Sequence, residues 1–277
     1  MPGGTGVVSE MTSFKGARGP VTAYLSRPDT EEARPAVVVI HEIWGLVGHI
    51  KDVADRFARE GYVALAPDLY SSDPELASLI TPQNVGTAMG FMQTLPPEKR
   101  ADMAFVQQEL AKQPAATRDV AQRVMGKLFG GMPKDALTEE AVKAVEHLNS
   151  QDYVRDGRVG TMGFCFGGGM SINTACHTKT AACVVFYGEN PTPIELVARI
   201  QSPVLGLYGG DDMRINSTLD KLVAAMVQHR KDFEMRVFPG APHAFFNDTN
   251  KTTYREGAAK EAWGLTLSFF RRTLQGG

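Results

Sequence analysis

The strongest constraint on the fold is a regular alternation of short apolar runs with amphipathic stretches. The apolar runs have the length of buried strands and lie at residues 35–40, 62–66, 158–163, 182–187, 203–208 and 233–238. Amphipathic stretches with helical spacing lie between or after them, at residues 49–60, 138–148, 193–200, 217–230 and 254–274. Strands that alternate with helices form a mostly parallel sheet with helices on both faces, because each helix returns the chain to the same end of the sheet. The sequence therefore predicts a single α/β domain over residues 1–277.

Two further patterns predict a pair of N-terminal strands and the first residue of a helix. Residues 7–14 and 21–25 have strand character and predict two strands that pair through the turn at residues 16–19. The sequence Thr-Glu-Glu-Ala at residues 138–141 is typical of a helix start, so we expect a helix to begin at Thr138.

Residues 71–137 interrupt the alternation. They contain apolar residues at helical spacing, divided by several prolines, but no convincing strand. A helical insertion of this length in a compact domain is usually a lid, a pocket wall or an interaction surface. A packed helical decoration without a catalytic role is the alternative.

The composition excludes several classes of partner. Lys and Arg number 29 against 31 Asp and Glu, so no positive field favours nucleic acid or an anionic membrane. Apolar runs such as residues 181–187 are too short to span a bilayer. The first residues lack the features of a signal peptide, which predicts a cytoplasmic protein. Three cysteines form neither a disulfide framework nor a zinc motif, so at least one thiol is free.

The sharpest chemical signal is the sequence Gly-Phe-Cys-Phe-Gly at residues 163–167, between a predicted strand and a helix of small residues. This is the pattern of a nucleophile elbow with Cys165 in the place of serine. The turn would lift the sulfur above the sheet at a helix N-terminus, which favours a thiolate. Phe166 could offer its backbone N–H to an oxyanion. A dinucleotide-binding loop does not fit the glycine spacing, whereas a structural buried cysteine stays open as an alternative.

The partners that a nucleophilic cysteine needs follow later in the chain. Asp211 and Asp212 come after the predicted strand at residues 203–208, and His243 comes after the strand at residues 233–238. The order of nucleophile, acid and histidine, each after a strand, is the order of α/β-hydrolases. These loops meet at one edge of a parallel sheet.

Together these residues resemble the dienelactone hydrolase family. The resemblance rests on five motifs in order, at residues 41–45, 61–70, 163–167, 209–212 and 240–243, and extends from about residue 20 to the C-terminus apart from the insertion. It implies an α/β-hydrolase fold with a helical insertion at about residues 71–137. It also implies a triad of Cys165, Asp212 and His243, with Asp212 preferred to Asp211.

The resemblance assigns roles to three further groups. Glu42 would contact the resting thiol and help to generate the thiolate, although it could also be a surface acid. The backbone N–H groups of Ile43 and Phe166 would form the oxyanion hole. Trp44, Phe164 and Asn247 are candidates for contact with substrate.

Asn247 departs from the family, whose best-known members have a carboxylate-binding arginine at this position. Their second arginine falls in the insertion, where Arg100, Arg118 and Arg123 are candidates. Methionines and phenylalanines are frequent in the insertion. We therefore expect a more apolar pocket that accepts neutral substrates.

The sequence thus predicts a hydrolase that cleaves a lactone or small carboxylic ester through a thioester on Cys165. No metal or organic cofactor is implied, and the oligomeric state stays open. A broad carboxylesterase or thioesterase is the first alternative. A non-catalytic protein of the same fold, whose Cys165 senses oxidants, is the second.

Overall fold

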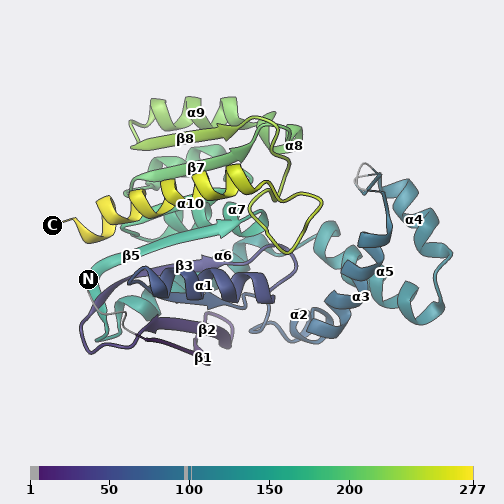
Figure 1. The fold of residues 1–277 in the computed structure, drawn as a ribbon, viewed down its shortest axis with the longest axis horizontal. Coiled ribbons are helices and arrows are strands. Elements are labelled where there is room, and N and C mark those ends of the chain that lie inside the picture. The colour runs from purple at the N-terminus through teal and green to yellow at the C-terminus, as the bar shows by residue number, and fades with distance from the viewer. Residues whose placement is uncertain (1–5, 97–98, 101, 277) are drawn as a thin grey trace.

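A computed structural model describes residues 6–96, 99–100 and 102–276, which form an eight-stranded sheet in the order β1-β2-β4-β3-β5-β6-β7-β8 (Figure 1). The strands are β1 (Val7–Lys15), β2 (Pro20–Pro28), β3 (Arg34–Ile40), β4 (Val63–Pro67), β5 (Val154–Phe164), β6 (Ala182–Phe186), β7 (Val204–Gly209) and β8 (Phe233–Phe238). Strands β3 to β8 are mutually parallel, whereas β1 and β2 are antiparallel to their neighbours. The predicted α/β-hydrolase fold with a mostly parallel sheet is confirmed.

Helices cover both faces of this sheet. The helices α1 (Gly48–Arg59) and α10 (Glu256–Phe270) lie in front of it in Figure 1, and α6 (Lys134–Asn149) and α7 (Phe166–His177) lie behind it. The chain also forms η2 (Ile194–Arg199), α8 (Met213–Asn216), α9 (Leu219–Gln228) and η3 (Arg271–Gln275). Along β3, Val37 and Val39 pack on the side of α1, and Val38 and Ile40 pack on the side of α6. Burial on both faces explains why this strand is continuously apolar.

The predicted start of α6 at Thr138 is wrong, because the helix begins at Lys134. Thr138 lies one turn inside the helix, is buried, and donates its Oγ1 hydrogen to the carbonyl oxygen of Lys134 at 2.8 Å. A threonine hydroxyl can bond back to the preceding turn as well as cap a helix. The local pattern therefore did not distinguish these two positions.

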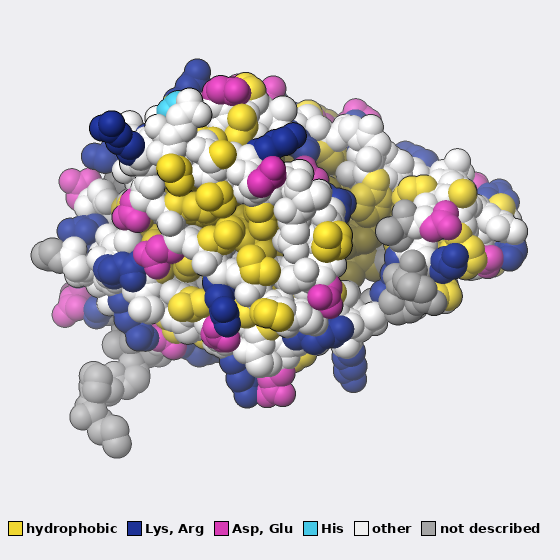
Figure 2. Space-filling model, turned by 90° about the horizontal axis from the view of Figure 1, so that it is seen from above, with side chains coloured by type: hydrophobic (Ala, Val, Ile, Leu, Met, Phe, Trp, Pro, Cys, Tyr) yellow, Lys and Arg dark blue, Asp and Glu magenta, His cyan; other side chains and the backbone are white. Residues whose placement is uncertain are grey.

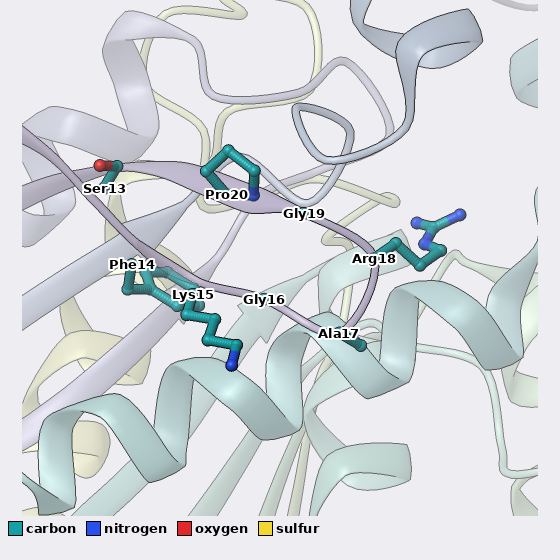
Figure 3. Close-up of a pocket in the computed structure, with 8 residues that line it drawn as sticks. All are labelled: Ser13, Phe14, Lys15, Gly16, Ala17, Arg18, Gly19 and Pro20. Carbon is teal, nitrogen blue, oxygen red and sulfur yellow. The ribbon is translucent and has the colours of Figure 1, made fainter.

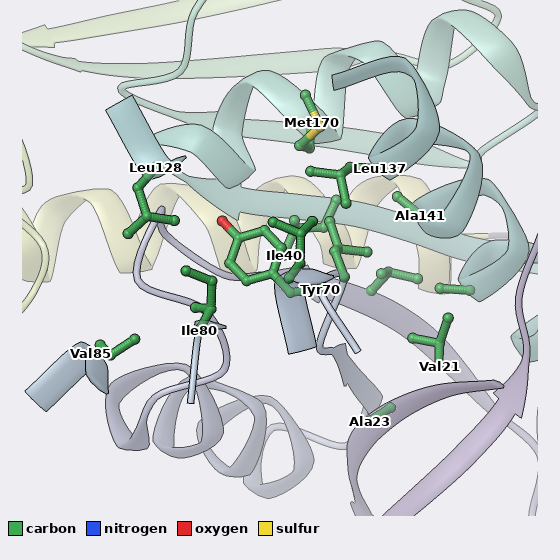
Figure 4. Close-up of a cluster of buried hydrophobic side chains, with 14 of the residues drawn as sticks. Val21, Ala23, Ile40, Tyr70, Ile80, Val85, Leu128, Leu137, Ala141 and Met170 are labelled. Carbon is green, nitrogen blue, oxygen red and sulfur yellow. The ribbon is translucent and has the colours of Figure 1, made fainter. Parts of the chain in front are cut away.

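The described residues between β4 and α6 include four α-helices at one end of the molecule. These are α2 (Pro74–Leu79), α3 (Pro82–Thr94), α4 (Met103–Ala111) and α5 (Ala115–Gly130). They project beyond the carboxyl ends of the parallel strands in Figure 1. Figure 4 shows that Ile80, Val85 and Leu128 of this segment belong to the same buried cluster as Ile40 and Tyr70. The insertion therefore packs at the sheet edge where the catalytic candidates lie.

The turn between β1 and β2 is held by a buried carboxylate. Gly16 donates its N–H to the carbonyl oxygen of Gly19 at 2.9 Å, and a shallow hollow lined by the turn residues surrounds this bend (Figure 3). Glu140 of α6 is fully buried and accepts the N–H groups of Ala17 at 2.7 Å and Arg18 at 3.2 Å. A Cβ atom at Gly16 would lie 2.2 Å from a Glu140 oxygen, so only glycine fits there. The predicted pairing of these two strands is confirmed.

Within the described ranges, no helix is both long and apolar enough to cross a membrane.

Candidate active site

Cys165 occupies a sharp turn between β5 and α7. Its φ of 55° and ψ of −117° are unusual for a residue with a side chain, and such strain is common at nucleophile elbows. A Cβ atom at Gly163 would lie 2.0 Å from the Gly167 carbonyl oxygen. A Cβ atom at Gly167 would lie 2.4 Å from the carbonyl oxygens of Ile40 and His41. Glycine is needed at both positions because backbone approaches backbone, as the sequence pattern predicts.

Helix α7 begins immediately after the thiol. Its first residue is Phe166, so the N–H groups of its first turn have no acceptor within the helix. They lie at the positive end of the helix dipole, beside Cys165. This position suits a thiolate and an oxyanion, both of which carry negative charge.

His243 and Asp212 lie on neighbouring loops and are hydrogen-bonded to each other through His243 Nδ1 and an Asp212 carboxylate oxygen. Asp212 follows β7, is buried, and caps α8 by accepting the N–H of Ile215 at 3.5 Å. Asp211, in contrast, is exposed. The structure thus brings Asp212, and not its neighbour, to the histidine.

The pKa of His243 is strongly displaced. Burial alone would lower it, but the charge of Cys165 and hydrogen bonds with Asp212 and Cys165 raise the pKa of His243 to about 10.

Glu42 lies close enough to His243 for the imidazole charge to act on its carboxyl group. It is buried, and its Oε2 accepts a hydrogen from Asn247 Nδ2 at 2.9 Å. Burial raises the pKa of Glu42, while the Asn247 bond and the positive charge of His243 oppose that shift. Its other oxygen, Oε1, has no hydrogen-bond partner among the described residues. The resemblance implies a contact between Glu42 and the Cys165 thiol, but Glu42 makes no hydrogen bond to Cys165 in the described structure.

A cavity of about 700 Å³ opens above Cys165 and His243. Figure 2 shows a hollow with hydrophobic side chains between the main body and the projecting helices. The apolar wall of the 700 Å³ cavity comes from the loop after β3, from the elbow and from the insertion. These residues are Ile43, Trp44, Phe166, Leu128, Phe129 and Met132. The rings of Trp44 and Phe129 meet edge to face with centroids 5.9 Å apart. The insertion therefore supplies part of the cavity wall.

Two predicted substrate contacts lie elsewhere. Phe164 is fully buried and packs on Phe186 and Phe246, with ring centroids 4.8 Å and 5.2 Å away. Asn247 is buried against Glu42. Of the three candidates, only Trp44 lines the cavity. Phe164 follows the alternation of β5 into the core, which the motif alone did not reveal.

The charged residues of the cavity differ from the arginines that the sequence suggested. Lys134 and Arg214 line it, and both pair with Glu189, at 2.7 Å and 2.5 Å. Arg100, Arg118 and Arg123 are not part of the cavity wall as the described residues define it.

Sequence reasoning gave no role to His41 and Tyr70. His41 donates its Nδ1 hydrogen to the Glu42 carbonyl oxygen at 2.7 Å, and the Tyr70 hydroxyl donates to the Ile43 carbonyl oxygen at 3.0 Å. The position of His41 directly after a buried strand was the signal that could have found it.

No group of three or more His, Cys, Asp or Glu in the described part of the chain could hold a metal ion.

Comparison with known proteins identifies the family of the chain. A model of the dienelactone hydrolase family matches residues 21–274. The chain belongs to the dienelactone hydrolase family. It is 38% identical, over 91% of its length and 94% of the relative, to a Saccharolobus solfataricus protein to which the activity of a carboxymethylenebutenolidase is provisionally assigned. It is thus a member of a family of hydrolases.

Solved structures share the fold of this dienelactone hydrolase family member. A crystal structure provisionally described as a dienelactone hydrolase, from Klebsiella pneumoniae, aligns with a TM-score of 0.73 at 24% identity, covering 96% of this chain and 99% of that one. The dienelactone hydrolase of Anabaena variabilis aligns with a TM-score of 0.62 at 17% identity, covering 97% of this chain and 99% of that one.

Proposed function

We propose that the protein hydrolyses a lactone or small carboxylic ester through a covalent thioester on Cys165. The observation that carries this proposal is the placement of Cys165 on a strained elbow in the same cavity as His243, which is bonded to the buried Asp212. Nucleophile, base and orienting acid are the three parts of a hydrolytic triad.

The reaction would proceed in two halves. The Cys165 sulfur attacks the ester carbonyl carbon, and the carbonyl π electrons move to oxygen to give a tetrahedral oxyanion. Collapse of this intermediate breaks the bond to the alkoxy oxygen, which takes a proton from His243. Water then transfers a proton to His243 and attacks the thioester, and the tetrahedral intermediate expels the thiolate. The carboxylic acid product leaves and releases its proton to solvent. Asp212 holds the imidazole in the required orientation throughout.

The oxyanion would be bound by the backbone N–H groups of Ile43 and Phe166. Phe166 lies in the first turn of α7, where N–H groups need external acceptors. Loss of one oxyanion donor costs about 10²–10³ in kcat in enzymes that use such a site.

Glu42 would act in activation of the thiol. Its buried carboxyl group, with a raised pKa and an unpartnered Oε1, can exchange a proton more readily near neutral pH than an exposed glutamate can. Asn247 would position this carboxyl group through its hydrogen bond to Oε2.

The cavity favours a neutral, largely apolar substrate that contacts Trp44. The lysine and the arginine of its described lining, Lys134 and Arg214, both pair with Glu189, so neither is committed to a substrate carboxylate. A broad carboxylesterase or thioesterase would use the same residues and differ only in acyl group. A redox sensor would not need the bond between His243 and Asp212, which argues for catalysis. The cytoplasmic location stays a prediction.

The deciding experiment replaces the nucleophile. Cys165→Ala should abolish turnover of small lactones and p-nitrophenyl esters, while Cys176→Ala should not. Iodoacetamide should label Cys165 first, because burial raises the pKa of Cys176 to about 12 and that of Cys183 to about 11. Retained turnover in Cys165→Ala would overturn the mechanism, and an inactive wild type with a reactive Cys165 would favour the sensor.

A further inference from the structure

The loop after β3 carries one half of the proposed oxyanion hole, and a buried histidine holds it. His41 is the first residue after β3 and is fully buried. Its Nδ1 donates to the carbonyl oxygen of Glu42 at 2.7 Å, and its Nε2 accepts the N–H of Leu69 at 3.2 Å. Both ring nitrogens therefore have partners within the protein.

These two bonds define the state of the ring. Nε2 accepts a hydrogen, so it carries a lone pair, and the ring proton must lie on Nδ1. Burial lowers the pKa of His41, which agrees with a neutral ring. A neutral His41 with both ring nitrogens engaged acts as a fixed hydrogen-bond donor to the Glu42 carbonyl oxygen.

We infer that His41 is a positioning residue of the oxyanion hole, which acts by fixing the orientation of the Ile43 N–H. This inference rests on the proposed function. The Glu42 carbonyl and the Ile43 N–H belong to one peptide unit and point in opposite directions because the bond is trans. The donor on His41, together with the Gly45 N–H at 3.1 Å, holds the carbonyl on one side. The N–H is thereby held on the other side.

Tyr70 fixes the next peptide unit in the same way. Its hydroxyl donates to the Ile43 carbonyl oxygen at 3.0 Å, and its ring meets that of His41 edge to face with centroids 4.7 Å apart. The Tyr70 ring also packs on Phe166, with centroids 6.3 Å apart, and lies in the apolar cluster with Ile40 (Figure 4). One tyrosine therefore contacts both halves of the proposed oxyanion hole.

The elbow and the loop are also in direct backbone contact. The space at Gly167 is so small that a Cβ atom would lie 2.4 Å from the His41 carbonyl oxygen. The peptide units that carry the two proposed donors, Ile43 and Phe166, are each within two residues of this contact. Their separation is thus set by backbone packing, and their direction by His41 and Tyr70.

Without the His41 donor, the Gly45 N–H is the remaining described donor to the Glu42 carbonyl oxygen, and the peptide between Glu42 and Ile43 rotates more easily. Rotation would turn the Glu42 carbonyl oxygen toward the developing oxyanion in place of the Ile43 N–H. The transition state would then lose a donor, while the bound ester, whose carbonyl carries little charge, would be less affected.

The experiment compares two amide substitutions at position 41. In His41→Asn the amide nitrogen occupies the place of Nδ1 and can still donate to Glu42, but the acceptor for Leu69 is lost. In His41→Gln the longer side chain can accept from Leu69 but offers no donor at the Nδ1 position. We expect His41→Gln to lower kcat on a p-nitrophenyl ester about 10²-fold with KM nearly unchanged. His41→Asn should retain kcat within about five-fold.

A second readout separates positioning from general disruption. Alkylation of Cys165 by iodoacetamide passes through no oxyanion, so His41→Gln should be alkylated at the wild-type rate. Loss of both reactions would show that His41 is merely structural, and equal kcat in the two variants would overturn the inference. Neither outcome touches the proposed function, which is tested separately by turnover in the wild type and in Cys165→Ala.

Tyrosine-to-phenylalanine substitutions provide a matched test. Tyr70→Phe removes only the hydroxyl that holds the Ile43 carbonyl, and should lower kcat about ten-fold at constant KM. Tyr208→Phe is the control, because the Tyr208 hydroxyl is buried without a hydrogen-bond partner among the described residues. An equal kcat for the two variants would contradict a role for Tyr70 in the oxyanion hole.

Discussion

The buried carboxylate of Glu140 provides the sharpest test of how the first two strands are attached. It accepts four hydrogen bonds: from the N–H of Ala17 at 2.7 Å, the N–H of Arg18 at 3.2 Å, Arg18 Nε at 3.3 Å and the Ser72 hydroxyl at 2.7 Å. One helix thus holds the β1–β2 turn and the loop after β4 together. Glu140→Ala removes all four bonds at once.

The expected loss of folding stability follows from the solvent exposure of the groups that donate hydrogen bonds to Glu140. Ala17 and Arg18 are exposed, so their donors can turn to water, whereas Ser72 and the carboxylate are buried. The two bonds of 2.7 Å are charge-assisted and contribute about 1.5 kcal/mol each, at the low end of the range for such bonds. We therefore expect Glu140→Ala to lower the free energy of unfolding by about 3 kcal/mol. At roughly 2–4 °C per kcal/mol, Tm should fall by about 6–12 °C.

Thermal and urea denaturation would measure this change. Glu139→Ala is the matched control, since Glu139 is the exposed neighbour on the same helix, and its effect should stay within about 0.5 kcal/mol. Amide exchange at Ala17 and Arg18 should accelerate in Glu140→Ala, while kcat should not change, because Glu140 does not line the cavity of Cys165 and His243. Equal stability of the two variants would refute the reasoning.

Three further predictions concern the cavity that Cys165 and His243 line. Asp212→Asn should lower kcat by about 10⁴-fold, as loss of the orienting carboxylate does in other triads, while Asp211→Asn should change kcat only a few-fold. Steady-state kinetics that show the reverse order would place the acid of the triad one residue earlier. The pKa of His243 is raised from 6.5 to about 10, so the stability that its protonated form contributes is complete below pH 6.5 and is lost as the pH rises toward 10. Urea denaturation across this range should therefore show the advantage of the wild type over His243→Gln shrinking with pH, and a constant advantage would contradict the paired state. A neutral ester should be hydrolysed at least as well as its carboxylate-bearing analogue, and a ten-fold preference in kcat/KM for the acid, about 1.4 kcal/mol, would show that a cation reaches the substrate.

Steric and burial constraints that act within a few residues made much of the fold predictable from the sequence. A strand buried on both faces must be apolar throughout, so the run at residues 35–40 identified β3. An elbow whose backbone approaches another backbone tolerates only glycine on either side, so residues 163–167 identified the turn at Cys165. In both cases the constraint acts within a few residues, and the sequence records it directly.

Candidate residues after each strand were predictable for a related reason. The carboxyl ends of parallel strands meet at one edge, so Cys165, Asp212 and His243 were expected to lie close together without knowledge of any contact. The pairing of His243 with Asp212, and the exposure of Asp211, agree with that expectation.

Contacts between segments that are distant in sequence were decided only by the tertiary structure. Nothing within a few residues of Asn247 indicates that it contacts Glu42, 205 positions away. In the same way, the sequence around Glu189 does not indicate that it pairs with Lys134 and Arg214. The hydroxyl of Tyr70 reaches a loop carbonyl 27 positions earlier, at Ile43. A side chain's type states which bonds it can make, but its partner depends on how whole helices and strands pack, and packing is a property of the assembled chain.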